Sequence, residues 1–150
     1  MIKKVLVLAC ILSLFSIQHL NSQSFSGNWA GNLTVQSDGE DVLLPYKMVI
    51  ITDGNGNCEG QTALWIGIDG ELYRSLYAFK GTYQGSALKF SDYKLIESDN
   101  PKNIDFYWCE KSGTLYLDGK TLSGNVVGYS PKGPCMPAKA SLTWDSEVEK

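Results

Sequence analysis

Turn-forming dipeptides punctuate this sequence about every fifteen residues. They are Asp38-Gly39, Asn55-Gly56, Asp69-Gly70, Gln84-Gly85 and Asn100-Pro101. Asp-Gly and Asn-Gly readily adopt the positive φ angles of tight hairpin turns, so each marks a point where one strand passes to an antiparallel neighbour. The intervening segments, about ten to twelve residues long, suit meandering strands and not helices. The spacing therefore predicts an all-β chain.

The segments between these turns alternate apolar and polar side chains. In residues 24–36, Phe25, Trp29, Leu33 and Val35 fall on one face, and polar residues occupy most of the other face. This period of two is typical of a strand with one buried side. Further strands are expected at 42–52, 58–68, 73–83, 87–97, 104–109, 114–117, 122–129 and 138–144.

Eight or nine strands joined by short turns would expose two edges as an open sheet. Closure into an antiparallel up-and-down barrel removes those edges, and it is the architecture that we expect. A β-sandwich is the main alternative, but it would need longer crossover connections. An outer-membrane barrel is disfavoured because the sequence lacks aromatic girdles and long loops.

The N-terminal segment has the pattern of a secretory signal peptide. Lys3 and Lys4 precede a short apolar run, and small and polar residues follow it. We assign residues 1–22 to the signal, 23–145 to the barrel and 146–150 to a frayed tail, and we expect a secreted or periplasmic protein. A lipid anchor on Cys10, in a lipobox-like context, is disfavoured because few apolar residues precede it. No other segment is expected to insert stably into a membrane as a helix.

Removal of that signal changes the chemistry that the chain can offer. The single histidine, His19, would leave with it, which excludes histidine-dependent nucleophiles and histidine-ligated metals. Eleven basic residues would then face sixteen acidic ones, so nucleic acid is a poor partner. We expect no metal and no cofactor.

Three cysteines remain in the expected mature chain, which suggests one disulfide and one spare thiol in an oxidising compartment. We predict the pair Cys109–Cys135, because a bridge would pin the loop 131–137 to a strand. Cys58 begins a strand and is expected to pack as a small apolar residue.

Two short motifs resemble a known group of barrels. Gly27-Asn28-Trp29 resembles the G-x-W signature that opens lipocalins and, in similar form, avidin-like proteins, both members of the calycin group. Lys80-Gly81-Thr82-Tyr83 resembles the G-T-Y turn segment of avidins. The resemblance implies a small ligand-binding barrel in which Trp29 closes one end.

Aromatic residues are numerous for so small a domain, and they either fill the barrel or line a cavity. The single arginine could clamp a ligand carboxylate if it faced the lumen. The candidate ligand-binding residues are Trp29, Tyr46, Trp65, Arg74, Tyr77, Phe79 and Trp108.

The function predicted from these patterns is non-catalytic binding of a small apolar or aromatic molecule inside a lipocalin-like barrel. The alternative is a protein-binding module, such as an inhibitor of a secreted hydrolase, that acts through the rigid loop 133–137. A carboxylate-based hydrolase is the third hypothesis, since Glu59, Asp92, Asp105 and Glu110 lie on or near predicted strands.

Overall fold

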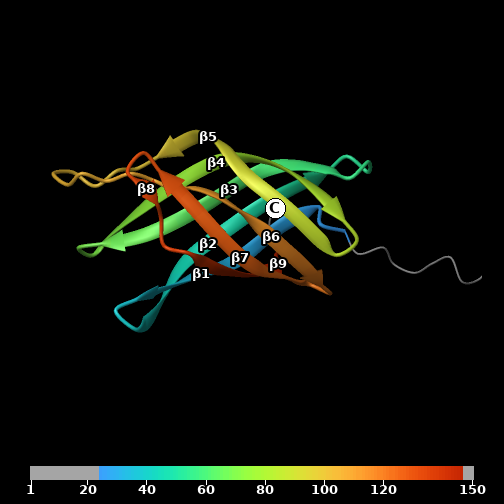
Figure 1. Ribbon diagram of the computed structural model, residues 1–150, viewed down its shortest axis with the longest axis horizontal. Helices are drawn as coiled ribbons and strands as arrows, with labels where there is room; N and C mark the ends of the chain where they lie inside the picture. Colours follow the sequence, from blue (N-terminus) through green and yellow to red (C-terminus); the bar gives the residue numbers. More distant parts are fainter. Residues whose placement is uncertain (1–23, 147–150) are drawn as a thin grey trace, which may run out of the picture.

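The computed structural model describes residues 24–146, which form one closed antiparallel β-barrel of eight long strands with one short extra strand (Figure 1). The strands are β1 (Gly27–Ser37), β2 (Glu40–Thr52), β3 (Asn57–Ile68), β4 (Glu71–Gln84), β5 (Ala87–Ser98), β6 (Glu110–Asp118), β7 (Thr121–Ser130), β8 (Gly133–Pro134) and β9 (Ala138–Trp144). The predicted signal peptide, residues 1–22, lies outside the described part of the chain.

Each long strand pairs with its neighbour in the sequence from β1 to β7, and β9 closes the barrel between β7 and β1. The predicted up-and-down barrel is confirmed, and the sandwich alternative was wrong. Between residues 24 and 146 there is no helix long and apolar enough to cross a membrane.

The two Asp-Gly turns have the backbone conformation that their sequences predicted, whereas Asn55 and Gln84 do not have positive φ angles and Asn100-Pro101 lies in a loop and not in a hairpin turn. Asp38 and Asp69 have φ angles of 51°, and the glycines that follow them, Gly39 and Gly70, have φ angles of 81° and 79°. Two consecutive residues with positive φ match the right-handed twist of the flanking strands. These turns therefore fix the register of β1 with β2 and of β3 with β4.

The predicted strand at 104–109 was wrong, because residues 99–109 form a loop. Two of its apolar side chains are nevertheless packed, because Trp108 belongs to the buried core and Phe106 lies against that core. The Trp108 Nε1 atom donates to the Asp99 carbonyl at 3.3 Å and to Asn100 Oδ1 at 2.9 Å, and its ring meets Phe106 edge-on. The next strand, β6, begins at Glu110, four residues before the strand predicted at 114–117.

The up-and-down topology gives the barrel two ends with different contents. We call the end that holds the β2–β3, β4–β5 and β6–β7 turns the turn end (at right in Figure 1). The loop end, opposite, holds the β1–β2 and β3–β4 turns, the loop 99–109 and the loop 131–137 with β8.

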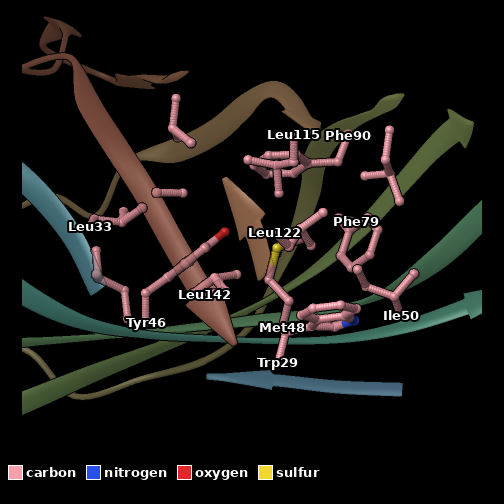
Figure 2. Close-up of a cluster of buried hydrophobic side chains, with 14 of the residues drawn as sticks. Trp29, Leu33, Tyr46, Met48, Ile50, Phe79, Phe90, Leu115, Leu122 and Leu142 are labelled. Carbon is pink, nitrogen blue, oxygen red and sulfur yellow. The ribbon is translucent and has the colours of Figure 1, made fainter. Parts of the chain in front are cut away.

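Side chains fill the barrel completely at the turn end. Trp29 is 2% exposed, and its Nε1 atom donates to the Phe25 carbonyl at 2.8 Å. Figure 2 shows Met48, Ile50 and Phe79 gathered around it. The predicted role of Trp29 as the residue that closes one end agrees with this placement.

Candidate ligand-binding site

An apolar cavity opens into the barrel at the loop end, and we call it the cup. Its volume is about 180 Å³. Residues of five strands, the disulfide, Lys111 and the loop residue Met136 surround it, and Val127 and Met136 are the exposed members of this lining. The lining residues are Leu33, Val35, Leu44, Leu64, Ile66, Cys109, Lys111, Val126, Val127, Gly128, Cys135, Met136 and Ala138. Lys111 is the only charged residue in this lining, so the cup offers an apolar surface with a single cation.

A buried polar cluster separates the cup from the packed turn end, and Asp92 lies at its centre. The Asp92 carboxylate accepts hydrogen bonds from the Thr62 hydroxyl at 2.9 Å and from the Lys111 backbone N–H at 3.0 Å. It also forms an ion pair with Lys111 Nζ at 2.8 Å. The side chains of Asp92 and Lys111 are 0% and 5% exposed, so the pair is almost completely removed from water.

This cluster also explains how the barrel stays closed where two strands separate. β5 pairs with β6 only from Ala87 to Ser91. From Asp92 onward the strands diverge. The backbone N–H of Lys111 therefore donates to the Asp92 side chain and not to a backbone carbonyl of β5. A buried N–H without a partner would cost about 1–3 kcal/mol, so the carboxylate replaces a missing hydrogen bond of the ladder.

The Lys111 ammonium group uses its donors within the protein. Besides the bond to Asp92, Nζ donates to the Cys109 carbonyl at 3.2 Å, and it lies 4.4 Å from the centre of the Tyr77 ring. An ammonium group has three N–H donors; Asp92 and the Cys109 carbonyl take two of them, and the Tyr77 ring makes a cation–π contact with the same group. Burial lowers the pKa of Lys111, and the charges of Asp92 and Glu110 oppose that effect.

Two hydroxyl groups in the same region, Tyr46 Oη and Ser75 Oγ, make no hydrogen bond of good geometry with a described residue. Both residues are 0% exposed. They flank Leu64, a residue of the cup lining, because Leu64 pairs with Tyr46 across β2 and with Ser75 across β4. In Figure 2 the Tyr46 hydroxyl points into the barrel.

Burial and a nearby negative charge both disfavour the charged form of the tyrosines in this region. Burial raises the pKa of Tyr46 well above its usual value, and the charge of Asp92 raises it further, whereas a hydrogen-bonding interaction with the nearby Thr62 hydroxyl lowers it. For Tyr77, burial together with Asp92 and Glu110 raises the pKa to about 12. Both tyrosines therefore stay neutral donors at physiological pH.

The predicted site residues divide into four groups, and none of the seven lines the cup. Tyr46 and Tyr77 face the lumen at the polar cluster, and Tyr77 also borders the depression beside the loop 99–109. Trp29 and Phe79 belong to the packed turn end, 2% and 1% exposed. Trp108 packs in the loop 99–109, where it borders an outer groove and not the cup.

The two remaining candidates, Trp65 and Arg74, lie on the outside of the barrel. They pair across β3 and β4, and Lys47 Nζ lies 5.9 Å from the centre of the Trp65 ring. Arg74 pairs with Glu97 at 3.1 Å, with both side chains well exposed. Arg74 therefore does not reach into the cup.

Sequence reasoning missed Lys111, Thr62 and Ser75, and it considered Asp92 only as a candidate acid for hydrolysis. A usable signal existed, because Asp92 follows Leu88 and Phe90 on the inward face of its strand. Lys111 likewise precedes Leu115 and Leu117 at the spacing of two. One acid and one base at inward positions indicate a buried ion pair.

Of the four acids considered for hydrolysis, Asp92 is held by Thr62 and Lys111, and Asp105 pairs with Lys132. Among residues 24–146, no group of three or more potential metal-binding side chains occurs.

The predicted disulfide between Cys109 and Cys135 is present. It joins the loop 131–137 to the start of β6 at the wall of the cup. Cys58 is free and buried, and burial raises the pKa of its thiol to about 11. A disulfide is consistent with the predicted export of the chain.

Three larger depressions are found on the described surface. One, of about 470 Å³, lies at the turn end beside Asp53, Asn57 and Lys80. A second, of about 490 Å³, runs between the loop 99–109 and β7, with Tyr107 and Tyr129 on its walls. The third, of about 410 Å³, is lined by residues of β1, β7 and β9. Polar residues contribute much of their lining, whereas the cup is the apolar cavity within the barrel.

No protein-family model matches this chain, and no curated protein matches it.

Proposed function

We propose that this protein binds a small, largely apolar molecule in the cup and catalyses no reaction on it. The observation that carries the proposal is an apolar cavity of about 180 Å³ at the loop end of the barrel. A cavity of roughly 150 Å³ lined by aliphatic and aromatic side chains is enough to bind benzene. The cup therefore suits a compound with a single ring or a short branched chain.

The position of the cup supports the proposal. Barrels of about eight strands have an interior that side chains just fill or that holds one small ligand. Here the turn end is filled and the loop end is open. The proposed function agrees with the calycin-like character that Gly27-Asn28-Trp29 suggested, and with a role outside the cytoplasm.

Calorimetric titration with indole, an uncharged compound close to the cup in size, tests the proposal. We expect saturable binding to the wild-type barrel. Ala138 is 8% exposed and lines the cup, so Ala138→Leu should fill the space and abolish binding. Ala63→Leu, on the outer face of β3, is the matched control and should bind as the wild type does. Equal indole binding by Ala138→Leu would contradict the assignment to the cup.

Exposed apolar side chains on the same end support a second function, binding of a protein such as a secreted hydrolase. Tyr129 is 62% exposed and Met136 58% exposed, and the disulfide restrains the loop that carries Met136. Secreted proteases and glycosidases assayed with the wild type and with Met136→Glu would test it. Inhibition by the wild type alone would support this function, and no inhibition of any enzyme would count against it.

A further inference from the structure

We propose that the cup selects an uncharged ligand, a carbonyl or hydroxyl compound, and rejects the carboxylate of the same size. This inference rests on the proposed function and specifies its ligand class. It follows from the ion pair between Asp92 and Lys111, which engages the charged groups next to the cup.

The first step concerns the only cation of the lining. A carboxylate ligand would need a partner for its charge, because an ionised group removed from water without one is strongly disfavoured. Lys111 is the single candidate in the cup, but its ammonium donors are directed to Asp92, the Cys109 carbonyl and the Tyr77 ring. To bind a ligand carboxylate, Lys111 would have to abandon a buried partner.

The second step concerns the net charge. Asp92 and Lys111 form a buried pair at 2.8 Å, so their charges offset one another. A ligand anion would bring an additional, uncompensated negative charge into this region. The other cations that the sequence analysis considered do not help, because Arg74 lies on the outer face, paired with Glu97.

The third step concerns the hydrogen-bonding groups that remain. Tyr46 Oη and Ser75 Oγ are buried and make no hydrogen bond of good geometry with a described residue, although the Thr62 hydroxyl lies near Tyr46 Oη. Neither residue lines the cup, but both flank Leu64, which does. Neutral hydroxyls donate well to a carbonyl or hydroxyl oxygen. Asp92, whose charge already raises the pKa of Tyr46, would repel an anion placed at the same hydroxyl.

The test compares acetophenone with benzoate, in which a charged oxygen takes the place of the ketone methyl group. Titration of the wild-type protein at pH 7.5 should give a dissociation constant for acetophenone at least about tenfold lower than that for benzoate, since a buried charge without a partner is costly. Indole, measured beside them, reports whether the cup binds anything at all.

Asp92→Asn provides a second measurement. It removes the negative charge and frees a donor of Lys111, so benzoate should gain affinity relative to acetophenone. Thr62→Val serves as the matched variant, because it removes a hydrogen bond to Asp92 and leaves both charges in place; its preference should remain that of the wild type. The comparison of the two ligands on the wild-type protein does not depend on either variant folding.

The outcomes separate the two proposals. Weaker binding of benzoate than of acetophenone supports the selectivity. Equal or tighter binding of benzoate overturns the selectivity and leaves the ligand-binding cup intact. Failure of indole, acetophenone and benzoate alike to bind overturns both proposals.

Discussion

The two ends of this barrel are built from the same strands, yet one is solid and the other is hollow. At the turn end Trp29, Met48, Ile50 and Phe79 are at most 2% exposed. At the loop end the same strands β1 and β2 contribute Val35 and Leu44 to an open cavity. The buried cluster around Asp92 and Lys111 lies between them. The contrast teaches that the choice of side chain at inward positions, and not the strand topology, decides where a barrel can hold a ligand.

The largest expected effect comes from emptying the solid end. Trp29→Ala removes a side chain that is 2% exposed, and we expect it to lower the free energy of unfolding by about 3–5 kcal/mol. Leu44→Ala removes a partly exposed side chain of the cup wall and should cost about 1 kcal/mol or less. Urea unfolding of both variants measures the contrast. Equal losses would show that the two ends are packed alike.

Breaking the polar cluster should have an effect of similar size. Lys111→Met leaves Asp92 buried without its cation, and we expect a loss of about 3–5 kcal/mol. The exposed pair of Arg74 and Glu97 is the control, because Arg74→Ala should cost only about 0–1 kcal/mol. The same unfolding measurement distinguishes them. A small loss for Lys111→Met would mean that the ion pair is not protected from water.

Backbone crowding offers a third test. A Cβ atom on Gly31 would lie 2.0 Å from the Ser141 carbonyl oxygen of the paired strand β9. Because that neighbour is backbone, Gly31→Ala should strain the closing pair of strands and cost about 1–3 kcal/mol. Gly67 has open space around it, so Gly67→Ala should change stability by no more than about 0.5 kcal/mol. If Gly31→Ala and Gly67→Ala shift the denaturant midpoint equally, the close contact between β1 and β9 does not limit stability.

The buried tyrosines predict an alkaline effect. The pKa of Tyr77 is about 12 in the folded barrel and 10.0 when unperturbed. Between these values the unfolded chain releases the proton and the folded chain keeps it, so stability falls as pH rises from 10 toward 12. Tyr77 should account for a decrease in the free energy of unfolding on the order of 2 kcal/mol over this pH range. Tyr77→Phe should reduce this loss, and the remaining loss comes from the other groups whose pKa is raised, which include Tyr46 and the Cys58 thiol.

Unfolding curves at pH 9, 10, 11 and 12 measure that slope. Tyr116 is 55% exposed, so Tyr116→Phe is the control and should follow the wild type. A wild-type stability that stays constant across this range would argue against burial of the tyrosine hydroxyls.

The sequence was sufficient to predict the barrel because its signals are local. The turn dipeptides and the alternation of side chains identified seven of the long strands closely, and the cysteine pairing was also predicted. The loop 99–109 was missed because Phe106 and Trp108 alternate like a strand while packing within the loop. Alternation with a period of two indicates that one set of side chains is buried, but it does not show whether the segment pairs with a neighbouring strand.

The candidate site was harder to predict, because it depends on contacts between distant residues. Thirty positions separate Thr62 from Asp92, and nineteen separate Asp92 from the Lys111 N–H. Only closure of the barrel brings them together. Arg74 shows the converse, since a single arginine looked suited to a lumen but occupies an outward position beside Glu97.

The central claim, that the loop end is hollow and receptive while the turn end is solid, is tested most directly by methyl NMR during a titration with indole. We predict saturable shifts for the methyl groups of Leu33, Leu44 and Ile66 in the cup, and none for Ile50, Leu115 and Leu142 in the packed interior. Saturable shifts confined to the second set, or the absence of any saturable shift, would contradict the account.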